Sequence, residues 1–157
     1  MTRVTIPELP RGPLLPPVYF LAALGVMAVL HWYLPIFQLI EKPLRYAGAL
    51  LIALSMGLVL WAAVLFKRAD TGIVPFTPTK ALVATGPYRF TRNPMYLGMV
   101  GTLLGAAVLF GTLAPLVAIP LFMALIEWRF ILAEEAMLIA AFGEAYAEYK
   151  ARVRRWL

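Results

Sequence analysis

Uncharged apolar stretches alternate with short polar segments along this chain, and the pattern predicts membrane-spanning helices. Residues 18–40 contain no charged residue, and residues 44–66 contain only Arg45, near one edge. Because roughly 20 apolar residues cross the hydrocarbon core of a bilayer, each stretch is long enough for one span. Glu41, Lys42 and Pro43 supply the turn between the two spans.

A third uncharged stretch, residues 93–126, is too long for a single span. As one helix its 34 residues would measure about 51 Å, whereas the hydrocarbon core is about 30 Å thick. The sequence Gly111-Thr112-Leu113-Ala114-Pro115 marks the bend, so we expect two helices over about 95–110 and 114–133. The charged remainder, residues 134–157, predicts an amphipathic helix and a tail.

A basic loop with several Pro and Gly residues separates the two pairs of spans, over residues 67–92. Irregular loops of this length are functional or disordered in compact proteins. Apolar residues at positions 74–76 and 82–83 predict that this loop is ordered. The expected fold is therefore all-α, a polytopic membrane protein with about four transmembrane helices, a cytoplasmic loop and a C-terminal helix.

The distribution of positive charge predicts the orientation of these spans. With four spans and a cytoplasmic N-terminus, twelve of the 14 Lys and Arg residues face inward and only Lys42 and Arg45 face outward. The positive-inside rule favours this arrangement. We expect both termini in the cytoplasm and the chain in the inner (cell) membrane of a bacterium. The twelve inner residues are Arg3, Arg11, Lys67, Arg68, Lys80, Arg89, Arg92, Arg129, Lys150, Arg152, Arg154 and Arg155.

The composition supports a membrane protein and excludes several kinds of chemistry. Apolar residues make up 62% of the 157 residues and charged residues 14%, whereas soluble domains average about 45–50% and about 25%. A membrane orientation explains the net charge of +6, so no nucleic-acid partner is expected. With no Cys and one His, a metal site is not expected. The length predicts a single membrane domain over 1–157, in which 1–66 hold two spans and 67–157 the loop, hairpin and last helix.

Two features of the spans favour structural roles. Gly101 and Gly105 are four residues apart in an uncharged stretch with no preceding strand, which is typical of close helix packing and not of a dinucleotide loop. His31 lies beside Trp32 and Tyr33 near the outer end of the first span, where an interfacial aromatic belt is expected.

Two other segments are candidates for chemistry. Glu134 and Glu135 follow an apolar stretch, and acidic residues near bilayer depth are usually paired or functional. They could join Glu127 and Arg129 in a charged cluster, or simply meet lipid headgroups. In residues 86–98, Pro94 suits the first turn of a helix with Asn93 as its cap. The free N–H groups there could receive an anion, although the segment could equally be an interfacial anchor.

The order of these motifs resembles a known enzyme family. Lys80-Ala81-Leu82-Val83-Ala84-Thr85-Gly86-Pro87-Tyr88 leads into Arg92-Asn93-Pro94-Met95-Tyr96-x-Gly98. Later come Glu134-Glu135-x-x-Leu138 and Phe142-Gly143-x-x-Tyr146-x-x-Tyr149-x-x-x-Val153. Together they resemble the isoprenylcysteine carboxyl methyltransferases, integral membrane enzymes related to the phospholipid methyltransferases. The resemblance covers about residues 67–155.

The resemblance implies S-adenosylmethionine as the methyl donor, with S-adenosylhomocysteine as its product and no metal. It implies a cytoplasmic cofactor site between the loop and the last helix, with a lipophilic or small acceptor and membrane lipid as partners. Glu134 could accept hydrogen bonds from the donor, and the rings of Tyr88 and Tyr96 could face its sulfonium. The implied cofactor-binding residues are Lys80, Ala81, Leu82, Val83, Tyr88, Asn93, Pro94, Met95, Tyr96 and Glu134.

This chain departs from the family pattern at two positions. Asn93 replaces a frequent His. Phe130 stands where the prenylcysteine enzymes have an Arg for the substrate carboxylate, so the neighbouring Arg129 is the candidate for that role. Glu135 is the candidate to take a proton from an amine acceptor.

The sequence therefore predicts an S-adenosylmethionine-dependent membrane methyltransferase that performs carboxyl O-methylation. Phospholipid N-methylation is the alternative among enzymes. A non-enzymatic scaffold or lipid-binding subunit is the alternative outside them.

Overall fold

The computed structural model describes residues 15–72 and 80–157, and within these ranges the chain is helical and contains no β-strand. The predicted all-α fold is confirmed. Arg3, Arg11 and the apolar positions 74–76 of the predicted loop lie outside the described residues.

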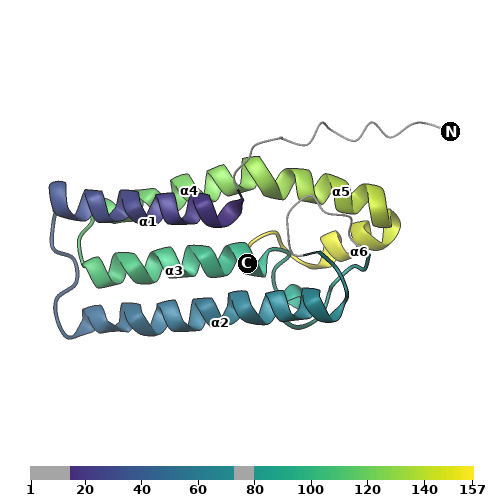
Figure 1. Cartoon of the computed structure of the whole chain (residues 1–157), viewed down its shortest axis with the longest axis horizontal. Helices are drawn as coiled ribbons and strands as arrows, with labels where there is room; N and C mark the ends of the chain where they lie inside the picture. Colours follow the sequence, from purple (N-terminus) through teal and green to yellow (C-terminus); the bar gives the residue numbers. More distant parts are fainter. Residues whose placement is uncertain (1–14, 73–79) are drawn as a thin grey trace.

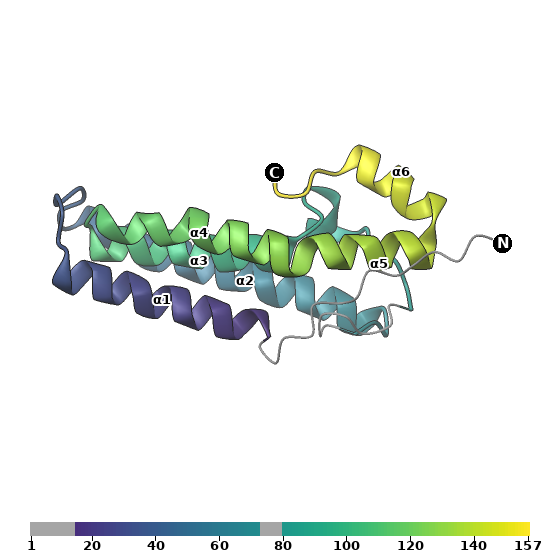
Figure 2. The same cartoon turned by 90° about the horizontal axis from the view of Figure 1, so that it is seen from above.

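Four long helical segments alternate in direction and lie side by side (Figure 1). The fourth segment is one continuous helix, because η3, α4, a π-helical turn and α5 follow one another without a break over Ala114–Phe142. A final short helix, α6, folds back beside the end of α5 (Figure 2). The helices are α1 (Pro16–Tyr33), α2 (Ala47–Arg68), α3 (Pro94–Phe110), α4 (Ala118–Ile126), α5 (Leu132–Phe142) and α6 (Glu144–Arg152), with 3-10 turns η1 (Leu44–Tyr46), η2 (Gly86–Arg89) and η3 (Ala114–Val117) and the π-turn Glu127–Ile131.

Three of these segments are long and apolar enough to cross a membrane, namely Pro16–Tyr33, Leu44–Arg68 and Ala114–Phe142, and α3 is a shorter apolar helix. Most of their large apolar side chains point outward, for example Leu21, Leu50 and Leu121, each more than 60% exposed. Such faces suit lipid and not water. The chain is therefore built as an integral membrane protein.

Glycines bring α2 and α3 into close contact. A Cβ at Gly98 or Gly101 would meet Ser55, and a Cβ at Gly105 would meet the carbonyl oxygen of Gly48. Only hydrogen fits at these positions, so the backbones approach more closely than larger residues permit. The small-residue packing face predicted from Gly101 and Gly105 is confirmed.

The bend predicted at residues 111–115 is also present. Gly111 ends α3 in the left-handed region at φ 72°. Its carbonyl accepts hydrogen bonds from the N–H groups of Leu39 (2.8 Å) and Ile40 (3.2 Å). The turn between α3 and η3 is thereby tied to the turn between α1 and α2, at the end of the bundle away from α6 (Figure 1).

Two predicted boundaries are wrong. The first helix ends at Tyr33 and not at residue 40, because Leu34 precedes Pro35 and such a residue disfavours the helical conformation. The last span does not end at residue 133 but continues to Phe142, where Gly143 breaks it with φ 52°. The charges at Glu134 and Glu135 do not stop the helix, since a bilayer boundary does not interrupt backbone hydrogen bonds.

Helix length places these charges at the edge of the membrane. The helix that starts at Ala114 crosses the hydrocarbon core in roughly 20 residues, so Glu134 and Glu135 lie where it emerges. We call the end of the bundle that carries these residues, η2 and α6 the site end.

Candidate functional site

A cavity of about 290 Å³ lies at the site end. Its walls come from the start of α1, the end of α2, the segment before η2, the start of α3, the long helix and α6. Ligand sites in proteins occupy about 300–1,000 Å³ and are mostly apolar with a few convergent polar groups. This cavity has that character, because Met and Leu side chains accompany Arg92, Glu134 and Glu135 on its walls.

The structure brings together nine of the ten predicted cofactor-binding residues on the wall of this cavity. They are Ala81, Leu82, Val83, Tyr88, Asn93, Pro94, Met95, Tyr96 and Glu134.

Lys80 is the predicted residue that does not line the cavity. Its ammonium pairs with the carboxylate of Asp70 at 2.7 Å, and both side chains are exposed. The N–H groups of Lys80 and Ala81 donate to the hydroxyl of Thr71, at 3.1 and 3.0 Å. Thr71 therefore fixes the segment that leads into the cavity, and these two N–H groups are already engaged.

Glu134 and Tyr96 form a polar pair on one side of the cavity. The Tyr96 hydroxyl donates to Oε1 of Glu134 at 2.8 Å. This bond connects the start of α3 with α5 and leaves Oε2 of Glu134 available to a ligand. A carboxylate held in this way is suited to bind hydroxyl or ammonium donors.

Three tyrosines surround a second side of the cavity. Tyr88 is buried in η2, with its ring 5.2 Å from that of Phe66. The hydroxyl of Tyr149 donates to the Tyr88 carbonyl at 2.7 Å, and Tyr146 packs beside Tyr149. Burial raises the pKa of Tyr88 and Tyr146 and raises the pKa of Tyr149 to about 12. All three phenols therefore stay neutral, and their electron-rich rings belong to the cavity wall.

Arg92 supplies a buried positive charge on the cavity wall. Its side chain is only 9% exposed, and Nη1 lies 3.2 Å from Oε1 of Glu135. Among the described residues, neither Nε nor Nη1 has a hydrogen-bond partner. Nη1 therefore has only the ion pair to Glu135, and the buried Nε has no partner among the described residues, which is a costly arrangement for buried donors.

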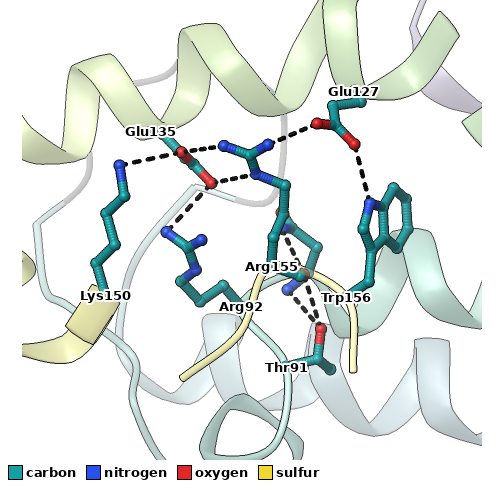
Figure 3. A network of polar contacts seen from close by, with 8 residues as sticks. Thr91, Arg92, Glu127, Glu135, Lys150, Arg155 and Trp156 are labelled. Atoms are coloured by element: carbon teal, nitrogen blue, oxygen red, sulfur yellow. Dashed lines mark hydrogen bonds and ion pairs between the residues drawn. The ribbon is translucent and has the colours of Figure 1, made fainter. Parts of the chain in front are cut away.

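Glu135 is the centre of a network of ion pairs (Figure 3). Arg155 donates to both of its oxygens, from Nε at 2.8 Å and from Nη2 at 2.9 Å. Lys150 lies 3.6 Å from Oε2. Arg155 also donates from Nη1 to Glu127, which accepts a further bond from the indole N–H of Trp156.

The π-turn at Glu127–Ile131 helps both carboxylates reach Arg155. On a regular helix, Glu127 and Glu135 would differ in direction by about 80°. A π-turn rotates each residue through a smaller angle, which brings the two side chains closer to one face of the helix. A charged cluster forms around Glu127 and Glu135, but neither Glu134 nor Arg129 belongs to it among the described residues, and its cations come from outside this helix.

Arg129 does not take the position that sequence reasoning gave it. It lies within the π-turn, lines no part of the cavity and makes no ion pair with any described residue. Arg92 occupies the cavity wall instead. The π-turn shifts the helical register around Arg129, and the spacing of residues on a regular α-helix does not predict this shift.

Asn93 also differs from expectation. It precedes Pro94 at the start of α3, but its side chain does not cap the helix. Its Nδ2 donates to the carbonyl of Arg155 at 3.0 Å. The hydroxyl of Thr91 donates to the same carbonyl at 3.0 Å. The start of α3 therefore holds the segment that follows α6, residues 153–157, which we call the strap.

The sequence motifs do not predict a site role for several residues that the structure places here. They are Arg92, Tyr146, Tyr149, Lys150, Arg155 and Trp156. The three-residue spacing of Tyr146 and Tyr149 puts both on one face of α6, and this was the available signal. No local pattern reveals the partners of Arg92 and Arg155, because they lie 20 or more residues away.

Two comparisons with known proteins find sequences similar to this chain. The sequence model of a family described as phospholipid methyltransferase matches residues 43–145. Protein-S-isoprenylcysteine O-methyltransferase of Schizosaccharomyces pombe is 34% identical over 76 residues. That match covers 46% of this chain and 30% of the yeast protein.

Proposed function

Because this chain belongs to the phospholipid methyltransferase family, we propose that it is an S-adenosylmethionine-dependent methyltransferase. Its proposed acceptor is a lipophilic molecule that carries a carboxylate, and its proposed reaction is carboxyl O-methylation. The observation that carries the choice of acceptor is the buried Arg92 guanidinium on the cavity wall, which has one ion pair to Glu135 and no hydrogen-bond partner at Nε or Nη1 among the described residues.

The residues of the cavity fit the chemistry of S-adenosylmethionine. Oε2 of Glu134 suits ribose hydroxyls or the ammonium of the amino-acid part. The neutral rings of Tyr88 and Tyr96 suit a sulfonium, because aromatic faces attract cations. Leu82 and Val83 suit the adenine. When bound, this cofactor supplies a methyl group that its sulfonium already activates, and S-adenosylhomocysteine remains.

The protein's own contribution is alignment and the exclusion of water. Tyr96 orients Glu134, and Tyr149 fixes the backbone of Tyr88. Fixing two reactants in line supplies much of the rate of such a transfer. We expect a bound donor and acceptor to displace water from these mostly apolar walls, which strengthens the electrostatic interactions inside.

Arg92 favours an anionic acceptor over an amine. The side chains around Glu135 carry three cations, Arg92, Lys150 and Arg155, against the two carboxylates of Glu127 and Glu135. Glu134 on the cavity wall balances this excess, so the preference for an anionic acceptor rests on Arg92, the one cation among the described residues that line the cavity, which attracts a carboxylate. Glu135 is also poorly placed to take a proton from an amine, since Arg155 occupies both of its oxygens.

The apolar walls suit the lipophilic part of the acceptor. Leu15, Met99, Met137 and Leu138 line the cavity at the edge of helices whose outer faces suit lipid. An acceptor that resides in the bilayer can therefore present its polar end to Arg92 while its hydrocarbon chain contacts these apolar side chains. The isoprenylcysteine in the name of the yeast relative likewise joins a carboxylate to a hydrocarbon chain.

A methyl-transfer assay tests the proposal. The purified protein in lipid nanodiscs is given S-adenosylmethionine with a labelled methyl group, together with N-acetyl-S-farnesylcysteine or phosphatidylethanolamine. We expect label in a base-labile ester of the farnesylcysteine. Arg92→Lys should raise the KM for this acceptor by roughly tenfold or more, because a lysine cannot form the bidentate contact. Arg129→Lys is the matched control and should stay within about twofold of the wild type.

The other outcomes are equally informative. Label in the amine headgroup and none in an ester would show phospholipid N-methylation and refute the carboxylate acceptor. Absence of transfer to either acceptor, together with no binding of S-adenosylhomocysteine, would support a non-enzymatic scaffold.

A further inference from the structure

The strap is anchored on both sides of Arg92. The backbone N–H of Arg92 donates to the carbonyl of Arg154 at 2.9 Å. The neighbouring side chains of Thr91 and Asn93 both donate to the carbonyl of Arg155. The position of the Arg155 side chain is therefore coupled directly to the backbone that carries Arg92 (Figure 3).

The side chain of Arg155 connects the strap to the long helix. It forms a bidentate pair with Glu135 and a further bond to Glu127. Bidentate arginine–carboxylate pairs fix the orientation of the carboxylate as well as its distance. The hydrogen bond from Arg155 to Glu135 raises the pKa of Arg155, so its charge persists at every physiological pH.

Arg155 and Arg92 consequently share the carboxylate of Glu135, and the interaction with Arg92 is the weaker of the two. Arg155 holds Glu135 by two hydrogen bonds, whereas Arg92 holds it by one ion pair at 3.2 Å that lacks hydrogen-bond geometry. Nε and Nη1 of Arg92 are both buried and have no hydrogen-bond partner among the described residues. If Arg155 were absent, Glu135 would be the nearest anion able to satisfy them, and a buried donor strongly favours such a partner.

We propose that Arg155 is a positioning residue that holds Glu135 away from a full pairing with Arg92 and so keeps the Arg92 guanidinium available to a ligand carboxylate. This inference rests on the proposed function, because the acceptor and the amino-acid part of the donor are the two sources of such a carboxylate. Arg155 is not among the residues that line the cavity, and its guanidinium is linked to that of Arg92 through the carboxylate of Glu135.

The test compares four variants in nanodiscs: Arg155→Ala, Arg155→Lys, Arg155→Ala combined with Glu135→Gln, and the control Arg152→Ala on the exposed side of α6. The readouts are the KM for N-acetyl-S-farnesylcysteine, kcat, and the Kd for S-adenosylhomocysteine. We expect Arg155→Ala to raise the KM or the Kd by about tenfold or more while kcat changes less. Arg155→Lys should lie between Ala and the wild type, because it pairs with Glu135 through one point charge.

The double variant distinguishes positioning from a general loss of structure. Gln at position 135 cannot form an ion pair with Arg92, so we expect it to recover most of the affinity that Arg155→Ala loses. An increase in KM alone assigns the carboxylate to the acceptor, and an increase in Kd alone assigns it to the donor, and both outcomes support the inference. If the double variant is as impaired as Arg155→Ala, or if Arg155→Ala behaves like Arg152→Ala, the inference is wrong.

A measurement without ligand keeps this inference separate from the proposed function. A double-mutant cycle of thermal unfolding with Arg92→Met and Glu135→Gln gives the coupling between these two residues. We expect a larger coupling in the Arg155→Ala background than in the wild type, because Glu135 then pairs fully with Arg92. An equal or smaller coupling would overturn the inference. If the wild type neither binds S-adenosylhomocysteine nor transfers methyl groups, the proposed function fails, and the double-mutant cycle alone then tests the role of Arg155.

Discussion

Glu134 and Arg92 give the cavity two chemically opposite sides. Glu134 faces it with a carboxylate that one tyrosine orients, and Arg92 faces it with a guanidinium whose nitrogens are incompletely satisfied. Ionisable groups at this depth in a membrane protein are costly and usually functional. An amphoteric ligand, with an ammonium or hydroxyl at one end and a carboxylate at the other, matches this arrangement.

For single residues of the cavity, we predict that Glu134→Gln weakens S-adenosylhomocysteine binding. Hydrogen bonds to a charged group contribute about 1.5–3 kcal/mol, which corresponds to roughly a 10- to 150-fold change in Kd. Isothermal titration calorimetry in nanodiscs measures this change. Tyr96→Phe should cause a smaller loss, because it removes only the bond that orients Glu134. The control Glu144→Gln, exposed on α6, should leave Kd unchanged; equal losses at positions 134 and 144 would contradict the assignment.

At the scale of the element, the cavity depends on how closely α2 and α3 pack. The start of α3 carries Asn93, Pro94, Met95 and Tyr96, and the end of α2 carries Phe66, so the helix pair fixes these walls relative to each other. Gly98 and Gly105 allow the close approach along the shared face.

We predict that Gly105→Ala destabilises the protein by about 1–3 kcal/mol, as over-packing of a filled contact usually does. The new Cβ would lie 2.7 Å from the carbonyl oxygen of Gly48 and 3.0 Å from the amide nitrogen of Ile52, and backbone atoms cannot yield as a flexible side chain can. Thermal unfolding in detergent measures the effect. Gly57→Ala on the exposed face of α2 is the control, since its Cβ would meet nothing within 4 Å. It should be neutral or stabilising by up to about 1 kcal/mol; an equal loss at both glycines would contradict the packing argument.

At the scale of the whole molecule, the alternating directions of the helices determine which segments meet. The start of α1, the end of α2, the start of α3 and the end of the long helix lie at the site end (Figure 1). The described basic residues gather there as well, apart from Lys42 and Arg45 at the opposite turn. A bundle with this asymmetry is expected to orient with its basic end in the cytoplasm.

This orientation predicts the behaviour of reporter fusions in a bacterial host. A fluorescent protein fused after Leu157 should fluoresce, and alkaline phosphatase at the same position should be inactive. Alkaline phosphatase inserted in the turn between α1 and α2 should be active. The reverse pattern would show that the site end faces outward, and the predicted cytoplasmic access of the donor would then be wrong.

The approximate positions of the spans, the bend at residues 111–115 and the packing face of α3 can be predicted from the sequence, because each depends on local composition or on spacing within one helix. The motif order also singled out most of the residues that line the cavity. The packing of the helices, by contrast, places Arg92 and not Arg129 on the cavity wall and makes Asn93 hold the strap instead of capping α3. These outcomes depend on a π-turn and on contacts such as Asn93 with Arg155, 62 residues apart. Local sequence carries no record of such distant pairings, since they exist only after the helices have packed.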